Sequence, residues 1–146
     1  MSWAGVITAI KTNCTSAGTD VTPNITHVRV GVPDSLTQDT IAIWPSGTRS
    51  PGNTFGQLHL ERGVQVTAYV RGSIRAGAID ETLEAKLVAV EAALFTRLWA
   101  DGDCGGNAIA IAIEGSTYDW VDLGDQVARV VTFTVWVWLE NVATIS

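Results

Sequence analysis

The sequence is short of charge, and above all of positive charge. Only 16% of its 146 residues are charged, and nine Lys or Arg stand against fifteen Asp or Glu, which gives a net charge of −6 at neutral pH. Proteins that hold duplex DNA use clustered Lys and Arg to displace counterions from the phosphates, and the sequence has no basic run. We therefore expect no specific nucleic-acid binding. An acidic surface lining a channel would let nucleic acid pass without binding to it. A mildly acidic net charge is, however, also common in soluble proteins for the sake of solubility.

Residues that build catalytic and metal sites are also few. The two histidines, His27 and His59, lie at no ligand spacing from a cysteine or carboxylate, so no zinc site of the usual form is encoded. The two cysteines, Cys14 and Cys104, stand far apart and are expected to be free thiols in a reducing cytoplasm. No nucleophile elbow, phosphate-binding loop or dinucleotide glycine pattern is present. The sequence thus predicts a protein that is not an enzyme and that has no cofactor.

One stretch begins like a calcium-binding loop, Asp101-x-Asp103-x-x-Gly106. Gly105 occupies a position where such loops carry an acidic or amide side chain, and Ala112 replaces the final bidentate Glu. A plain turn between a helix and a strand is the favoured interpretation.

Apolar residues make up 47% of the chain but never form a long run. No window approaches the ~20 apolar residues of a membrane span, and the start lacks the pattern of a secretion signal, so we expect a protein that is neither inserted nor secreted. A chain of this length should form one domain, 1–146, around one core. Apolar surface that the core does not hide is expected to form a patch that a partner covers.

The apolar spacing in the first half predicts one helix and three strands. The expected elements are a short helix over 2–13 capped by Ser2, a loop over 15–24, strands over 25–32 and 40–44, a long exposed loop over 45–57, and a strand over 57–71. Two prolines and three glycines among small polar residues make the 45–57 loop a candidate contact arm, with Arg49 and Phe55 as interface candidates. The parity of apolar residues favours one strand kinked at Gly63 over a hairpin there.

The second half begins with the strongest helix pattern, over 80–99 with Asp80 as its cap. One stripe is expected to face the core: Leu83, Leu87, Val90, Leu94 and Leu98. A second stripe of Val88, Phe95 and Trp99 lies about a third of the circumference away. Burial of this second stripe within the domain is favoured over contact with a partner.

After a glycine-rich turn the pattern predicts a strand over 108–114, an acidic loop over 115–125 and a last strand over 127–139. Asp119, Asp122 and Asp125 in that loop favour a solvated segment over a cation site or a docking edge for a basic partner. Both faces of the last strand are mostly apolar, so both sides of the sheet should be covered near it. Together the elements predict an α+β fold, with a mostly antiparallel sheet flanked by a short N-terminal helix and one long helix.

Six tryptophans are many for this length. Trp136 and Trp138 share a strand face with Thr132 and Thr134, which fits either a covering helix or a neighbouring subunit. With Trp44 and the second helical stripe, they complete the set of interface candidates.

The order of elements from Val64-Gln-Val-Thr-Ala-Tyr-Val70 to Arg129-Val-Val-Thr-Phe-Thr-Val-Trp-Val137 resembles that of the tail terminator proteins of long-tailed bacteriophages. The likeness covers residues 57–140 and rests on element order, length and pattern. It implies a homo-oligomeric ring, a hexamer, that caps the tail tube, ends its polymerisation and joins the tail to the head connector protein. The virion would be assembled in the host bacterial cytoplasm, with DNA passing through the lumen.

Two alternatives stay open. One is another neck or tail-completion protein, because these share the general fold. The other is a small-ligand or peptide-binding α+β domain in which Trp44, Trp136 and Trp138 line a pocket.

Overall fold

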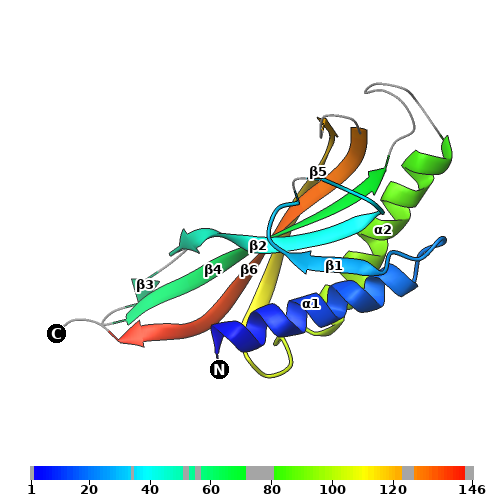
Figure 1. Cartoon of the computed structure of the whole chain (residues 1–146). Helices are drawn as coiled ribbons and strands as arrows, with labels where there is room; N and C mark the ends of the chain where they lie inside the picture. The colour runs from blue at the N-terminus through cyan, green and yellow to red at the C-terminus, as the bar shows by residue number, and fades with distance from the viewer. Residues whose placement is uncertain are drawn as a thin grey trace.

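A computed structural model of the chain shows two helices packed on one face of a six-stranded sheet (Figure 1). The structure describes residues 2–33, 35–50, 53–54, 57–71, 81–122 and 127–143, and for 53–54, 57–59 and 140–143 it describes the backbone alone. The fold is α+β with a mostly antiparallel sheet, as the sequence predicts.

The first helix, α1 (Trp3–Thr19), begins where the sequence places it. Ser2 caps it, because its Oγ accepts a hydrogen bond from the Gly5 backbone N–H at 3.0 Å. The helix extends past residue 13, so the predicted loop over 15–24 is wrong in its first part. Cys14 and Ala17 continue the buried stripe of α1, and the hydroxyl of Thr15 donates to the Lys11 carbonyl one turn earlier. Small hydroxylated residues are thus accommodated inside the helix.

The second helix, α2 (Glu81–Ala100), carries the predicted core stripe. All five of its apolar positions are buried: Leu83, Leu87, Val90, Leu94 and Leu98. The predicted cap, Asp80, lies outside the described residues. Neither α1 nor α2, the helices of the described part, combines the length and hydrophobicity that a membrane span requires.

The strands follow the order β1-β2-β4-β6-β5 across the sheet, and β3 pairs with β4 beside this path. Their bounds are β1 (His27–Val30), β2 (Thr40–Arg49), β3 (Asn53–Thr54), β4 (Gln57–Arg71), β5 (Ala110–Asp122) and β6 (Val127–Ala143). The β1–β2 pair is parallel, and the other pairs are antiparallel. In the described part of the chain, β1 and β5 are therefore the edges at the two ends of this path.

The continuous strand predicted over 57–71 is confirmed. Opposite Gly63, where the sequence predicts a kink, the partner strand β2 bulges between Pro45 and Gly47. A Cβ on Gly63 would overlap the Ser46 Oγ and come within 3.0 Å of Trp136 Cζ3. Glycine is therefore needed here for the close approach of two side chains.

Two predicted loops are largely strand. Residues up to Arg49 belong to β2 and pair with β4 as far as Glu61, and Asn53–Thr54 form β3, so the loop predicted over 45–57 is wrong for these residues. The acidic segment is paired with β6 as far as Asp122. In each case a β-bulge accommodates the residues that interrupt the strand pattern. Backbone hydrogen bonds to the neighbouring strand then outweigh the turn-like composition of the segment.

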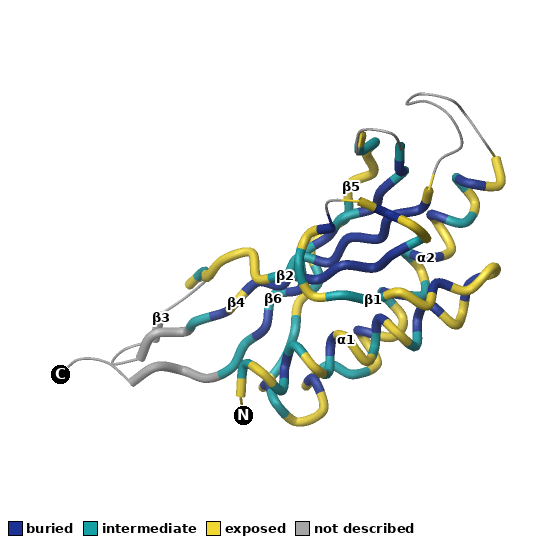
Figure 2. The backbone as a smooth tube through the Cα atoms, in the orientation of Figure 1, coloured by how far each residue is buried: buried dark blue, intermediate teal, exposed yellow. Residues whose placement is uncertain are grey.

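The main core lies between the sheet and the two helices (Figure 2). Alternate residues of the central strands enter it, among them Val64 and Val66 of β4 and Val131, Phe133 and Val135 of β6. We call this side of the sheet the helix side. A smaller cluster on the opposite side covers one end of the sheet: Leu36, Ala42, Tyr69, Ala128 and Val130.

Candidate functional site

The side of the sheet that faces away from both helices carries three of the six aromatic candidates. Strand alternation directs Trp44, Trp136 and Trp138 to this side, because the residues next to them enter the core on the helix side. In the register, Trp136 lies opposite Gly63 and Trp138 opposite Glu61. We call this surface the helix-free face. Three of the residues proposed from sequence are thus brought together by the fold.

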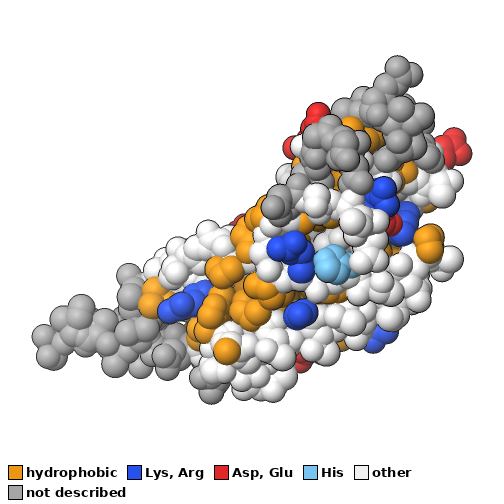
Figure 3. Space-filling model, in the orientation of Figure 1, with side chains coloured by type: hydrophobic (Ala, Val, Ile, Leu, Met, Phe, Trp, Pro, Cys, Tyr) orange, Lys and Arg blue, Asp and Glu red, His pale blue; other side chains and the backbone are white. Residues whose placement is uncertain are grey.

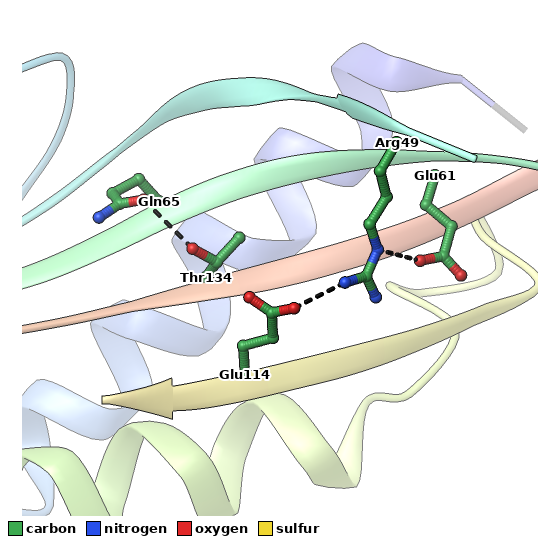
Figure 4. A network of polar contacts seen from close by, with 5 residues as sticks. All are labelled: Arg49, Glu61, Gln65, Glu114 and Thr134. Carbon is green, nitrogen blue, oxygen red and sulfur yellow. Dashed lines mark hydrogen bonds and ion pairs between the residues drawn. The ribbon is translucent and has the colours of Figure 1, made fainter. Parts of the chain in front are cut away.

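Arg49 ties this face together (Figure 4). Its Nε donates to Glu61 Oε1 at 2.8 Å, and its Nη1 donates to Glu114 Oε1 at 2.6 Å. The guanidinium also lies 4.2 Å from the centroid of the Trp136 ring, a cation–π contact. One side chain from β2 therefore links β4 and β5 across Trp136 of β6, and its guanidinium is paired with two carboxylates.

The other polar groups on the helix-free face also pair with one another. Thr134 Oγ1 donates to Gln65 Oε1 at 3.2 Å (Figure 4), and the hydroxyls of Thr67 and Thr132 are hydrogen-bonded at 3.0 Å. Trp136 Nε1 is buried without a hydrogen-bond partner among the described residues. Lateral hydrogen bonds thus connect neighbouring strands across this face, and the area that it offers to a partner comes mainly from its half-buried aromatic side chains.

A second candidate surface lies along the side of α2 that carries the second stripe. Val88 and Trp99 are 53% and 68% exposed, so the expectation that the second stripe is buried within the domain is wrong for both. Phe95 is half-buried and packs edge-on against Phe133, with ring centroids 4.8 Å apart. Of the three residues in the second stripe, Phe95 alone packs against the main core. Val88 and Trp99 lie on the part of the helix surface that is turned away from the sheet.

Trp99 and Phe95 line a groove of about 390 Å³ between α2 and the edge strand β5. The residues around it are Phe95, Thr96 and Trp99 of α2 and Ile113, Glu114 and Gly115 of β5. Glu114 belongs both to this α2–β5 groove and to the Arg49 network of the helix-free face. The two candidate surfaces therefore meet along β5.

The acidic candidates lie on β5 instead of in a loop. Asp119 and Asp122 are exposed, and Asp119 Oδ1 accepts a hydrogen bond from the Trp120 backbone N–H at 2.8 Å. Asp125 and Phe55, the remaining candidates, lie outside the described residues. The predicted loop is therefore wrong as far as Asp122, whereas the solvent exposure expected for Asp119 and Asp122 is confirmed.

The stretch that begins like a calcium loop forms a turn. Asp101 Oδ1 accepts from the Gly105 backbone N–H at 2.9 Å, and its Oδ2 accepts from Asn13 Nδ2 at 2.7 Å, which ties the turn to α1. Gly105 and Gly106 have φ angles of 66° and 87°, values that glycine adopts without strain. Over the described ranges, no three His, Cys, Asp or Glu side chains gather as metal ligands do.

Both cysteines are free and buried. Burial raises the pKa of Cys14 to about 12, and burial together with the charges of Asp101 and Asp103 raises that of Cys104 to about 11. The two thiols are therefore protonated at neutral pH and are poor nucleophiles.

Sequence reasoning missed the carboxylates that hold Arg49. Glu61 and Glu114 are distant in the chain from each other and from Arg49, and the strand order brings them together. Had residues 45–49 been recognised as strand, side-chain alternation could have placed Arg49 on the same face of the sheet as Glu61 and Trp138.

No protein-family model matches the chain, and a search of curated proteins finds no match.

Proposed function

We propose that the protein is a structural subunit of a ring that caps a bacteriophage tail tube, ends its polymerisation and joins the tail to the head connector. The observation that carries this proposal is an apolar surface left outside the domain's own core. Trp99 is 68% exposed beside the α2–β5 groove, and three half-buried tryptophans gather on the helix-free face. Tryptophan-rich surfaces of this kind are typical of protein interfaces.

The arrangement of elements supports the same proposal. The tail-terminator resemblance rests on a long strand, a long helix, a turn and two strands in that order. The chain forms β4, α2, β5 and β6 in the order that this resemblance requires. These elements make up the centre of the sheet and one of its edges, with α2 across the helix side. A shared order of elements supports the class of protein, and the exposed surface supports the assembly role.

The charges support a lumen through which DNA passes without being held. Four cationic side chains of the described part are paired with carboxylates: Arg49, Lys86, Arg97 and Arg129. A cation that is already neutralised contributes little to phosphate binding. The net charge of −6 adds repulsion. We place the protein in the neck or tail of the virion, assembled as a hexamer in the bacterial cytoplasm.

The test is assembly, alone and on tail tubes. Native mass spectrometry should give a species of six times the 15.5 kDa chain mass, either in solution or after tail tubes are added. Negative-stain electron microscopy should show one ring at the end of each tube and tubes of fixed length. A monomer that never associates with tubes would contradict the proposal. A ring that ignores tubes but binds connectors would indicate another neck protein.

A further inference from the structure

The two edges of the sheet differ in their chemistry. In the described part of the chain, β1 and β5 each pair on one side only, so each presents a row of backbone N–H and C=O groups on the other. Each side chain along an edge strand lies on one side of the sheet, and the side follows from the residue opposite it in the neighbouring strand.

Along residues 118–120 of β5, the two aromatic side chains lie on the helix side and Asp119 lies on the opposite side. Tyr118 lies opposite Val131, which is in the main core, so Tyr118 is on the helix side, where it is 42% exposed. Asp119 lies opposite Val130 and is therefore on the helix-free side. Trp120 returns to the helix side and packs against the main core.

On β1, the same alternation occurs with the opposite charge. Val30 lies opposite Ile43 and is on the helix side, where it is 48% exposed. Arg29 lies opposite Ala42 on the helix-free side, and its Nε is buried without an acceptor among the described residues. Seen from the side of β1 in Figure 3, basic side chains stand among hydrophobic ones, and acidic side chains are few.

We propose that β1 of one copy pairs edge to edge with β5 of the next copy, with Arg29 opposite Asp119. This inference rests on the proposed ring and names the surfaces that close it. The two strands run in opposite directions within the sheet, because the β1–β2 pair is parallel and the three pairs between β2 and β5 are antiparallel. A rotation about an axis along the strands keeps those directions, so the contact is antiparallel and sets Val30 opposite Tyr118.

Both sides of the sheet are complementary in this arrangement. On the helix-free side a cation meets an anion, and on the helix side Val30 meets the ring of Tyr118. The antiparallel direction also carries Val32, which is 58% exposed, toward the end of the α2–β5 groove where Trp99 is exposed.

Charge also favours unlike edges over like ones. Two copies paired through β5 would bring Asp119 and Asp122 of one copy toward those of the other, and two copies paired through β1 would oppose their arginines. Repulsion of this kind disfavours a symmetric dimer and favours head-to-tail contact, which repeats around a ring.

Cross-linking between single-cysteine variants tests the pairing directly. Val30→Cys and Tyr118→Cys are prepared separately and mixed, and a short bismaleimide is added, which reaches residues about 5–8 Å apart across a strand pair. The buried Cys14 and Cys104 of the unchanged protein serve as the background control. The mixture should give covalent dimers, each variant alone should give none, and the double variant should give a ladder that ends at the ring size.

The outcomes separate this inference from the proposed function. Rings seen by native mass spectrometry without cross-links in the mixture would overturn the edge pairing and leave the ring proposal standing. Cross-links within one variant alone would show a symmetric contact and overturn it too. A protein that never assembles, even on tail tubes, would overturn both.

A charge exchange gives a second readout. Arg29→Glu and Asp119→Arg should each weaken assembly at least about tenfold, and the two together should restore it, because the ion pair is rebuilt with its partners exchanged. Lys11→Glu and Asp103→Arg make matched charge changes at exposed positions away from both edges and should leave assembly unchanged. Failure of the double variant to recover, with its fold intact by circular dichroism, would refute the Arg29–Asp119 contact.

Discussion

Replacement of Trp99 should affect assembly and folding by different amounts, and both amounts can be worked out from its exposure. A fully buried tryptophan covers up to about 250 Å². With 68% of Trp99 exposed, roughly 170 Å² is open to a partner, and at about 25 cal/mol per Å² this surface is worth up to about 4 kcal/mol on association. The buried remainder contributes about 2 kcal/mol to folding by the same conversion. Trp99→Ala should therefore affect assembly more than stability.

Leu94 is the matched control, because it lies on the same helix and is fully buried. Leu94→Ala should cost about 2–5 kcal/mol of folding free energy, through lost transfer energy and the cavity left behind. In a chain of this size each kcal/mol lowers the melting temperature by about 2–4 °C. Phe95→Ala should fall between the two, since its ring is half-buried against Phe133.

The assay measures thermal unfolding and ring formation for all three variants. The expected result for Trp99→Ala is a small loss of melting temperature and a large loss of rings. If it lowers the melting temperature as far as Leu94→Ala does, Trp99 belongs to the domain's own core. If it folds and assembles normally, the α2–β5 groove is not an interface, and the contact must be sought at Trp136 and Trp138.

Three further predictions test the fold around these surfaces. Gly63→Ala should lower the free energy of unfolding, measured in urea, by about 1–3 kcal/mol, because the new Cβ meets Ser46 and Trp136. Gly115→Ala is the control and should be nearly neutral, because nothing lies within 4 Å of its new Cβ. Equal losses for the two variants would refute the close-approach argument. The hydrogen bond from Arg97 lowers the pKa of Asp20 below its usual value near 3.8. Arg97→Gln should therefore be less stable than the unchanged protein above about pH 4, and the two stabilities should converge at lower pH as Asp20 is protonated. A stability difference that does not depend on pH would contradict this. Cys14 and Cys104 should resist a thiol reagent at pH 8 until urea is added, because both are buried with raised pKa values; rapid labelling of the folded protein would show that they are accessible.

The helices and the long strands could be predicted because their signals are local. The stripe of α2 repeats every three or four residues, and Ser2 lies one residue before the first apolar turn, so periodicity and capping are enough. The parity of β4 could also be read, since a hairpin at Gly63 would have mixed apolar and polar residues on one face.

The extensions of β2 and β5 could not be predicted, because their signals are not local. Pro45 and Gly47 resemble a loop by composition, yet backbone pairing with β4 continues past them through a bulge. Gly115 is absorbed in the same way between Glu114 and Thr117. The exposure of Trp99 depends on how far the sheet extends beneath α2, which the phase of a helical stripe does not specify.

The helix-free face suggests why an assembly subunit would keep a polar network beside its tryptophans. Trp136 lies over Gly63, and Arg49 stacks on its ring while two carboxylates hold the guanidinium. An aromatic side chain fixed in this way loses little further freedom when a partner covers it, so more of its buried area is converted into affinity. The network therefore contributes to binding through rigidity, although its own hydrogen bonds run within the subunit.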